Sequence, residues 1–274
     1  MRTSLFAQGE PMIWLTGGGL AIALVMITGL LMLVAAQGLG TLWPAPVVQL
    51  ELKDGRRVMG EVTRAETAPI PRRLLRTGNF ELTGEHFQWI GETNVARETR
   101  PAWALVVERL SWGRFYGLPR AFLVDGQVVA TEAEAIWALF NRHLEPVRDR
   151  RREQRRLETR EIGRINLRLE KARLAIRSAE LRDGPGSGTV RQASARLARI
   201  EPAAQAESAR IRARIAALNK ENARYQIVLA TADGREEKLA LADIVRASPP
   251  NRLGRAGKLR VYFSRWGEFL TGVP

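Results

Sequence analysis

The first part of the chain is an unbroken apolar segment. Residues 12–36, MIWLTGGGLAIALVMITGLLMLVAA, contain no charged side chain. A helix that rises about 1.5 Å per residue crosses a hydrocarbon core of roughly 30 Å within this length. Trp14 and Trp43 stand near its ends, where amphipathic rings sit at the headgroup level of a membrane. The pattern predicts a transmembrane helix over residues 12–37, preceded by a short leader over residues 1–11.

A cleaved secretory signal is the alternative for this segment, because small residues after Leu33 offer a cleavage position. The apolar part of a signal is usually about 7 to 15 residues long and follows basic residues. Here the leader holds only Arg2 and is followed by Glu10, and the apolar run is longer. The pattern therefore favours a retained anchor.

Alternating apolar and polar positions follow the anchor and predict a β-rich module over residues 44–130. The stretch VVQLELKDGRRVMGEV, residues 47–62, carries this alternation on both sides of Asp54-Gly55. An Asp-Gly pair supplies the positive φ angles of a tight primed hairpin turn. Short strands at this spacing predict a small open barrel or a curled sheet. The further strands are expected at residues 73–76, 80–82, 87–90, 103–110 and 121–124.

The apolar period changes from two to 3.6 at residue 131, which predicts a helical region over residues 131–224. Thr131 and Glu134 have the spacing of a capping box at the start of the first helix. Pro146 should break or kink that helix, and Pro202 should kink a later one, because proline lacks the amide donor of the helical ladder.

Two heptad segments lie within this region, separated by the turn DGPGSG at residues 183–188. Each segment can bury its apolar stripe on the other, so an antiparallel coiled-coil hairpin is expected. The heptad positions before the turn are Ile162, Ile165, Leu169, Ala172, Ile176 and Ala179, with Leu167, Leu174 and Leu181 as a second series; those after it are Val190, Leu197, Ala204, Ile211, Leu218 and Tyr225.

Strand patterning returns in a hairpin over residues 225–251, with Asp233-Gly234 at its tip. It repeats the design of residues 47–62: a strand, a polar Asp-Gly tip and a second strand. We therefore expect the coiled coil to be an insertion, with the last hairpin packing beside the first sheet. The predicted fold class is α+β, with an N-terminal transmembrane helix, a small, mostly antiparallel β-module and an inserted antiparallel coiled-coil hairpin.

The last segment, residues 257–274, combines aromatic and basic residues at helical spacings. Such an amphipathic segment is typical of a membrane interface, and a structural helix packed on the β-module is the alternative. With Trp14 and Trp43, the side chains expected at the membrane interface are Tyr262, Phe263, Trp266 and Phe269.

Basic residues outnumber acidic ones, 43 to 29, which gives a formal net charge of +14. Half of the excess lies in residues 142–182, with 14 basic and 7 acidic side chains. Such a run either contacts nucleic-acid phosphates or forms the solvated face of a coiled coil with paired glutamates. The heptads favour the second interpretation, so nucleic acid is a disfavoured partner. The residues expected to contact an anion or a protein partner are Arg150, Arg151, Arg152, Arg155 and Arg156.

The sequence carries no pattern typical of an enzyme. It has no cysteine and lacks the G-x-x-x-x-G-K-[ST] loop that cradles nucleotide phosphates. Its two histidines, His86 and His143, do not have the spacing of metal ligands. We therefore expect a non-enzymatic protein without catalytic residues, a cofactor or a metal site.

Several stretches of the chain resemble one family. The anchor end GLGTLWP, the hairpin VVQLELKDGRRVMGEV and the later stretches LLRTGNFELTGEHFQWI, LADIVRASPPN and KLRVYFSRWGEFLTG are similar to the N-terminal extension of the long, proteobacterial form of PstA. PstA is a permease subunit of the phosphate ABC importer. The similarity covers most of the chain apart from the helical hairpin, and no single motif in it is catalytic.

The resemblance implies a bacterial inner-membrane protein that works with a second permease subunit, cytoplasmic ABC ATPases and a periplasmic phosphate-binding protein. It implies an amino terminus in the cytoplasm and a soluble extension in the periplasm. In that family the SRWGEFLTG segment precedes the transmembrane permease core, through which the ATPases would be contacted. Further apolar spans are therefore expected beyond Pro274, and no transport-site residue is carried over.

The local charges favour the opposite orientation. Only Arg2 precedes the apolar segment, whereas Lys53, Arg56 and Arg57 follow it. The positive-inside rule weakens when basic residues lie more than about 15 residues from the span and when a long domain follows. We therefore expect the orientation that the resemblance implies.

Three hypotheses remain open at this stage. The first is a transport component whose extension contacts the partner permease or the phosphate-binding protein. The second is a bitopic membrane scaffold whose basic coiled-coil hairpin recruits another protein or touches anionic lipid. The third is a membrane-tethered nucleic-acid binder, whose affinity would fall steeply with salt.

Overall fold

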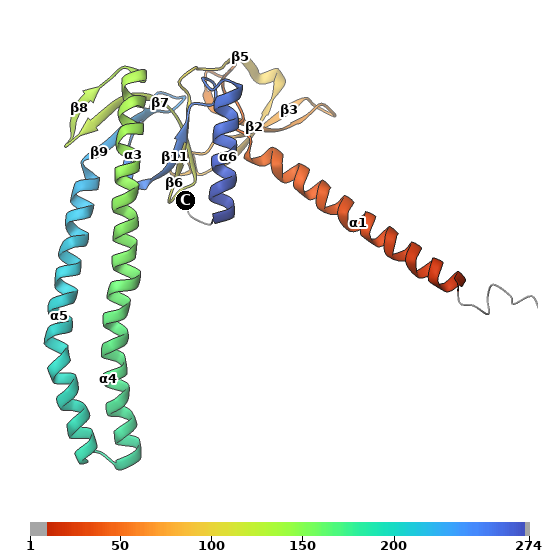
Figure 1. The fold of residues 1–274 in the computed structure, drawn as a ribbon. Helices are drawn as coiled ribbons and strands as arrows, with labels where there is room; N and C mark the ends of the chain where they lie inside the picture. The colour runs from red at the N-terminus through yellow and green to blue at the C-terminus, as the bar shows by residue number, and fades with distance from the viewer. Residues whose placement is uncertain (1–9, 272–274) are drawn as a thin grey trace, which may run out of the picture. The chain divides into compact units, whose positions relative to one another are not determined.

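The computed structural model of the chain describes residues 10–271, so most of the predicted leader lies outside them (Figure 1). These residues form an α+β fold with an apolar N-terminal helix, two antiparallel sheets and a helical hairpin. They divide into two compact units. Pro46–Arg252 holds both sheets and the hairpin, and the first and last helices belong to the other unit.

The unit formed by the ends of the chain contains α1 (Glu10–Leu42) and α6 (Arg255–Thr271). The α1 segment Trp14–Gly38 has a mean hydropathy of 2.5 and no buried part, so it is long and apolar enough to cross a membrane. Arg265 of α6 donates a hydrogen bond from Nη1 to the carbonyl oxygen of Leu42 at 2.9 Å. This bond satisfies a terminal carbonyl that α1 itself leaves without an intrahelical partner.

The first sheet is an antiparallel meander whose last strand returns to its first. The predicted hairpin of residues 47–62 is confirmed: its two strands pair, with Val48 opposite Gly60. A 3₁₀ turn, η2 (Glu92–Asn94), leads into the last strand. The strands are β1 (Val47–Leu52), β2 (Arg57–Glu66), β3 (Arg72–Arg76), β4 (Phe87–Gly91) and β5 (Val95–Thr99), in the spatial order β4-β3-β2-β1-β5.

The strand predicted at residues 80–82 is wrong, because this segment forms the short helix α2 (Phe80–Thr83). Asn79 precedes it in the left-handed conformation, with φ of 53°. The Asn79 side chain accepts a hydrogen bond from the Tyr116 amide at 2.8 Å and donates one to the Tyr116 carbonyl at 3.1 Å. These bonds fix a chain reversal that removes the segment from any strand ladder.

The second sheet takes in the returning hairpin. The returning hairpin packs beside strands of the β-module predicted over residues 44–130, because β9 forms its ladder with β7, where Val124 lies opposite Tyr225; it does not join the sheet of β1 to β5. A long apolar β7 is what makes this possible: it pairs with β6 at its start and with β9 at its end. The strands are β6 (Leu105–Arg109), β7 (Arg114–Val124), β8 (Gln127–Ala130), β9 (Tyr225–Ala230), β10 (Glu236–Ala240) and β11 (Ile244–Ser248), in the order β10-β9-β7-β6-β11, with β8 beside β7.

The two sheets repeat one topology. Both place the fourth, third, second, first and fifth strands of a module side by side in that order. Both reach the fifth strand through a 3₁₀ turn, η2 in the first sheet and η4 (Leu241–Asp243) in the second. Gly60 and Gly117 occupy matching places in the second strand, and a Cβ at either would collide with a neighbouring strand. In the second module the helical region of residues 131–224 is inserted between the second strand, β7, with its neighbour β8, and the third strand, β9.

The Asp-Gly turns differ from the prediction. In the β1–β2 and β9–β10 turns only the glycines, Gly55 and Gly234, have positive φ, so these loops are not two-residue primed turns. The primed turn lies instead at Asp125-Gly126 between β7 and β8, where both residues have positive φ, 53° and 79°. The other two loops are longer, so a positive φ at one glycine is enough to reverse the chain.

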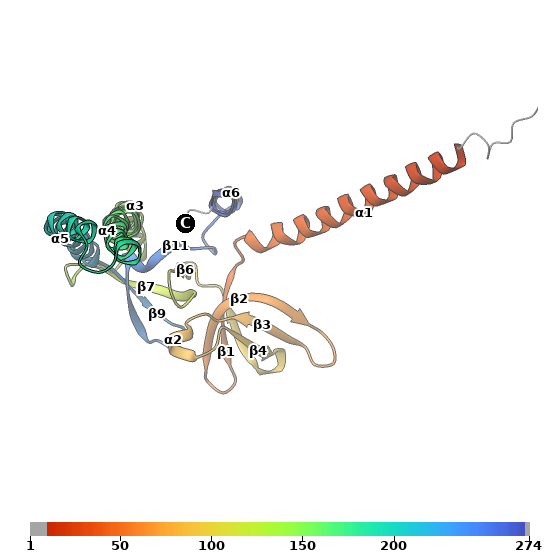
Figure 2. The ribbon, with the colours of Figure 1, turned by 90° about the horizontal axis from the view of Figure 1, so that it is seen from below.

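The helical region consists of α3 (Ala133–Arg156), a π-helical turn (Leu157–Glu161), α4 (Ile162–Asp183) and α5 (Gly188–Ala223). Figures 1 and 2 show these helices side by side as long rods that extend away from the strands of their own unit. The DGPGSG turn separates α4 from α5, as the sequence predicts.

The capping box predicted at Thr131 and Glu134 is wrong. Glu132 precedes the first turn of α3 without a side-chain cap. The Glu134 carboxylate instead accepts hydrogen bonds from Trp103 Nε1 at 3.2 Å and from Arg252 Nη1 at 2.6 Å. Two long-range charged or aromatic partners outcompete one local backbone amide for the same carboxylate.

The helices continue through both prolines, so Pro146 does not break its helix, which was one of the two outcomes expected there. Pro146 is exposed, but its neighbour Val147 is buried in the core. The next residue, Arg148, donates a hydrogen bond to the Val245 carbonyl. Likewise Pro202 lies two residues before the buried Ala204. Packing on both sides of each proline outweighs the one backbone bond that it removes.

The first half of α3 belongs to the core of the second sheet. Ile136, Phe140 and Val147 are buried on one face of α3, at the spacing of a helix stripe that covers a sheet. They pack with the following residues of the sheet and of η4: Leu105, Val107, Phe115, Phe122, Ile227, Leu229, Leu241 and Ile244. Beyond this half of α3, the hairpin extends past the core.

Removing the distal hairpin is expected to leave the core stable. Glu153 of α3 and Arg214 of α5 form an ion pair at 2.9 Å, so a Gly-Ser-Gly-Ser link between them can replace residues 154–213. Because none of the residues that pack with the second sheet is lost, the free energy of unfolding of the remaining unit should change by no more than about 0.5 kcal/mol, measured by urea denaturation. Phe140→Ala in the same background is the control and should cost about 3–5 kcal/mol. A truncated chain that fails to fold would contradict this division.

A stability that falls at mildly acidic pH is expected from His143. Its ring stacks on Tyr225 at 4.5 Å and on Phe122 at 5.9 Å. Burial, and then the charges of Arg142 and Arg150, lower the pKa of His143 in the folded chain. The unfolded chain therefore binds a proton near its ordinary pKa of about 6.5 while the folded chain does not, so stability is retained above that pH and declines below it.

The measurement is the midpoint of urea unfolding at pH 7.5 and pH 5.5, compared between the parent chain and His143→Phe. The parent should lose stability over this interval and the variant should lose less. Equal pH dependence in the two proteins would show that His143 is not responsible.

Candidate functional site

The seam of the hairpin is the face on which α4 and α5 meet, and it buries members of one predicted heptad series. Ile165 and Ala179 of α4 are buried there, as is Ala204 of α5; Leu218 of α5 is also buried, further along, where α5 runs beside α3. The second series, Leu167, Leu174 and Leu181, does not join the seam and is exposed. A single partner helix can cover only one stripe of α4, so the other stripe remains on the surface.

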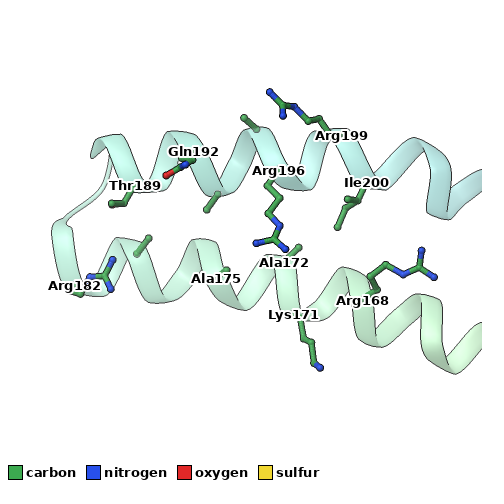
Figure 3. A pocket seen from close by; sticks show the side chains of 13 residues that line it. Arg168, Lys171, Ala172, Ala175, Arg182, Thr189, Gln192, Arg196, Arg199 and Ile200 are labelled. Carbon is green, nitrogen blue, oxygen red and sulfur yellow. The ribbon is translucent and has the colours of Figure 1, made fainter.

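A groove of about 980 Å³ lies between α4 and α5 near the DGPGSG turn (Figure 3). Small side chains such as Ala172 and Ala175 leave this space between the helices. Figure 3 shows Arg196 pointing from α5 across the space toward Ala172, while Lys171 and Arg199 extend away from the facing helix. We call this feature the basic groove; its basic side chains are Arg168, Lys171, Arg182, Arg196 and Arg199.

The basic groove has a strongly positive lining. No acidic residue lines it among the described residues. Arg168 pairs with Glu207 at 3.4 Å and Arg182 pairs with Asp183 at 3.0 Å. The Arg182 guanidinium and the Thr189 hydroxyl hold the pKa of Asp183 at about 2, so that pair stays ionised. The remaining three cations favour a negatively charged partner.

Three cations of the groove have no ion pair in the described part of the chain: Lys171, Arg196 and Arg199. The surrounding stretch, residues 162–200, contains nine basic and three acidic residues, a net charge of +6. The positive field at the hairpin tip therefore comes from an excess of cations rather than from a few aligned pairs, and it will be screened by salt.

A leucine stripe runs along the opposite face of α4. Leu167, Leu174 and Leu181 recur every seven residues, with 55%, 55% and 75% of their surface exposed. At 100° per residue, Lys171 and Arg177 lie about 60° to either side of Leu174. An exposed apolar row with basic flanks is typical of a helix face that receives another helix.

The five arginines predicted as a contact cluster do not form one surface. Arg150 donates a hydrogen bond from Nε to Asn222 Oδ1 at 2.6 Å, and Arg151 donates from Nη1 to the Ala242 and Ile244 carbonyls at 3.1 and 3.3 Å. Arg150 thus joins α3 to the end of α5 at the base of the hairpin, and Arg151 holds α3 to η4 and β11. Burial, together with the charges of neighbouring arginines, lowers the pKa of Arg151.

The other three predicted arginines face solvent. Arg152 pairs with Glu145 at 3.0 Å and also with Asp149. Arg155 and Arg156 are exposed, and neither forms an ion pair with another described residue. They directly precede the π-helical turn (Leu157–Glu161), so they lie along the hairpin between its base and the basic groove.

The residues predicted at a membrane interface fall at both ends of α1. Trp14 is exposed near its start, and Leu42, its last residue, lies about 42 Å further along the axis, close to the thickness of a bilayer with its headgroups. At that end the Trp43 and Tyr262 rings lie 5.7 Å apart, and Phe263 meets Tyr262 edge-on at 5.6 Å. Trp266 is partly exposed on α6, and the side chain of Phe269 lies outside the described residues.

The structure offers no metal centre within residues 10–271: no group of three or more His, Asp or Glu side chains comes together there. Comparison with protein-family models, with curated proteins and with solved structures found no match to the chain. The surface is therefore interpreted from its own chemistry.

The basic groove was missed from the sequence. Its unpaired cations come from both arms of the hairpin, Lys171 from α4 and Arg196 with Arg199 from α5. The charge run that is visible in the sequence lies at residues 142–182 instead, because those cations are close together along the chain. The signal that could have found the groove is the coincidence of small residues at seam positions with basic residues beside them on both arms.

Proposed function

We propose that this chain is the membrane-anchored N-terminal extension of the permease subunit of a phosphate ABC importer. In this proposal α1 spans the bacterial inner membrane and the unit Pro46–Arg252 lies in the periplasm. The hairpin is a coiled-coil insertion in the second sheet module and serves as a docking arm. The family resemblance of the sequence supports the transporter assignment, and the apolar, unburied α1 is the observation that carries the anchor.

The partners in this proposal are the second permease subunit, the periplasmic phosphate-binding protein and, through the permease core, the cytoplasmic ABC ATPase. The basic groove supports a docking role, since three of its five cations form no ion pair among the described residues. The role is non-enzymatic: the extension binds and positions. A direct test is the reading frame beyond codon 274, where several further apolar spans are expected. A frame that closes there without them would contradict the permease assignment.

Reversing the charge of the groove is expected to lower phosphate uptake. The change is Lys171→Glu, Arg196→Glu and Arg199→Glu, which leaves the base of the hairpin intact. Since electrostatic steering changes association rates by about tenfold or more, uptake at low phosphate and low ionic strength should fall by about tenfold, measured with radiolabelled phosphate in whole cells. The loss should shrink at high salt.

The control carries the same change in net charge at other exposed positions of the hairpin. Arg210, Arg212 and Lys220 are exposed on α5 and line no part of the groove. Their replacement by Glu should leave uptake within about twofold of the parent. Equal losses in both variants would show that net charge, rather than the groove, matters.

A bitopic scaffold is the second candidate, and the leucine stripe favours it. An exposed heptad row with basic flanks suits an apolar helix that carries acidic residues at its edges. Because the chain has no cysteine, a Leu174→Cys variant carrying a photo-activated cross-linker reports only from the stripe. Cross-linking to an importer subunit would support the transporter, and cross-linking only to an unrelated membrane protein would support the scaffold.

A further inference from the structure

The basic groove has an apolar floor between its cations. Ala172 and Ala175 of α4 and Ile200 of α5 belong to this floor. Figure 3 shows Ile200 pointing from α5 into the space between the two helices. Lys171 and Arg199 extend away from the facing helix, so they lie at the two edges of the groove. The groove therefore combines an apolar centre with a cation on either side.

The hairpin itself does not close this floor. Ala175 of α4 and Ala195 of α5 line the groove and are exposed. Nearer the base of the hairpin, by contrast, Ile165 and Ala204 are buried in the seam. The distance between packed helix axes, about 8–10 Å, is set by the side chains at the contact. A third helix can therefore approach closely where the floor is formed by alanines.

The groove has the length of a short helix. Its lining runs from Arg168 to Arg182 on α4 and from Thr189 to Ile200 on α5. At a rise of about 1.5 Å per residue, these stretches are about 21 and 16 Å long. A helix of about three or four turns, each about 5.4 Å long, would fill this length.

The positive charge of the lining is not balanced among the described residues. Two of the five cations are paired with carboxylates. The side chains of the other three, Lys171, Arg196 and Arg199, form neither an ion pair nor a hydrogen bond with another described residue. All three are exposed. Guanidinium groups bind carboxylates through paired, charge-assisted hydrogen bonds, so three carboxylates on an occupant would neutralise the groove.

The apolar floor favours a protein helix over a nucleic acid as the occupant. A nucleic acid would meet the same cations through its phosphates, but it would leave the floor without an apolar partner. An amphipathic helix with acidic edges uses both parts of the groove, because its apolar face covers the floor while its carboxylates meet the cations.

We propose that the basic groove binds an acidic amphipathic helix of about three or four turns, which forms a three-helix bundle with α4 and α5 beside the DGPGSG turn. The apolar face of the bound helix lies on the alanine-lined floor, and its carboxylates contact Lys171, Arg196 and Arg199. This inference names the partner of the docking arm and rests on the docking role proposed above.

Four probes separate the parts of the proposal. A peptide with three repeats of LAALEAE carries leucine on one face and glutamate on both edges of that face. Three repeats of LAALKAK replace the glutamates with lysines, and three repeats of AAAAEAE lack the leucines. The fourth probe is a single-stranded oligodeoxynucleotide with the same net charge as the acidic peptides. Binding is measured by fluorescence anisotropy of each labelled probe with the full chain in nanodiscs of zwitterionic lipid.

The LAALEAE peptide should bind at least about tenfold more tightly than each of the other three probes, because it alone makes both the apolar and the charge-assisted contacts. Equal affinities for the acidic and basic leucine peptides, or for the LAALEAE peptide and the oligonucleotide, would overturn the proposal. Absence of LAALEAE binding at roughly 10⁻³ M, a concentration at which a weak specific contact is already populated, would also overturn it.

Two variants of the groove test the location. Lys171→Glu with Arg196→Glu and Arg199→Glu should reverse the preference, so that the LAALKAK peptide binds at least about tenfold more tightly than the LAALEAE peptide. Ala175→Phe fills the floor without a change of charge and should weaken LAALEAE binding by about tenfold. Because Ala175 is exposed, this variant keeps the test valid if the triple charge reversal disturbs the hairpin. Unchanged LAALEAE binding in both variants would place the site elsewhere.

The matched control removes the leucine stripe. Leu167→Ser with Leu174→Ser and Leu181→Ser changes exposed side chains that do not line the groove, so it should leave LAALEAE binding unchanged. Binding that is lost in this variant and kept in both groove variants would place the helix on the stripe and overturn the proposal.

Phosphate uptake separates this inference from the transporter assignment. If the LAALEAE peptide binds the groove and the charge-reversed chain still takes up phosphate at the parental rate, the transporter assignment fails and the acidic-helix site stands. If uptake falls in the charge-reversed chain and no acidic peptide binds, the acidic-helix site fails and the transporter assignment stands.

Discussion

Replacing Glu61 with alanine is expected to lower the free energy of unfolding by about 3–5 kcal/mol, the cost of breaking a buried ion pair by removing one partner. The Glu61 carboxylate receives hydrogen bonds from Arg114 and Tyr116 in a nearly solvent-free site. Without it, the Tyr116 hydroxyl loses its buried partner and Arg114 loses the closer of its two carboxylates, keeping only Glu108 at 3.2 Å. In the parent chain burial, followed by the negative charge of Glu61, raises the pKa of Tyr116, so the hydroxyl stays protonated and donates to Glu61.

Urea unfolding followed by circular dichroism measures this loss. Tyr116→Phe removes one hydrogen bond from the same carboxylate and should cost about 1 kcal/mol. Glu51→Ala is the matched control, because Glu51 and Arg57 form a surface pair at 3.7 Å, and its cost should stay below about 1 kcal/mol. If Glu61→Ala cost no more than Glu51→Ala, the network would not hold the first sheet to β7.

Two arginines at the centre of α1 are expected to release the chain from membranes. Leu24 and Ile27 lie near the middle of the apolar segment Trp14–Gly38. Each arginine at the centre of a membrane helix costs about 2.5–3.5 kcal/mol on insertion scales, so Leu24→Arg with Ile27→Arg costs about 5–7 kcal/mol in total. The fraction of the chain that stays in the membrane pellet after alkaline carbonate extraction should fall sharply.

The exchange Leu24→Ile with Ile27→Leu is the control for this pair and should leave the membrane fraction unchanged. A double-arginine variant that remains as firmly membrane-bound as the parent would mean that α1 is not what holds the chain there. A parent chain whose mature form begins near Gly38 would mean that the apolar segment is a cleaved signal.

The sequence predicts those elements whose pattern is local. The β1–β2 and β9–β10 hairpins, the DGPGSG turn and the seam of α4 and α5 all follow from apolar periods and turn residues that neighbours in space do not override. The apolar helix α1 belongs to the same class, because its segment Trp14–Gly38 has no buried part whose packing could alter its conformation.

The features that the sequence does not predict depend on partners far along the chain. Asn79 bonds across to Tyr116 and turns an expected strand into α2. Glu134 pairs with Arg252 rather than capping its own helix. The repeated topology of the two sheets is equally hidden, because the helices separate β7 from β9 in the chain.

The candidate sites follow the same division. The arginine run at residues 150–156 is visible as a sequence pattern, but burial and backbone acceptors assign Arg150 and Arg151 to the base of the hairpin. The basic groove combines residues from both arms of the hairpin. It is not marked by residues at a fixed spacing along the chain, so no single sequence pattern reveals it.

The central claim is that α1 anchors the chain with the unit Pro46–Arg252 in the periplasm. The side of the membrane on which this unit lies tests it most directly. Because the chain has no cysteine, Ser194→Cys, which is exposed on α5, and Ser4→Cys, which precedes α1, can each be labelled without background. A maleimide that does not cross the inner membrane should label Ser194→Cys in intact spheroplasts, and should label Ser4→Cys only after the membrane is opened. Labelling in the reverse order, or labelling of both variants in intact spheroplasts, would contradict a chain that α1 anchors with its body in the periplasm.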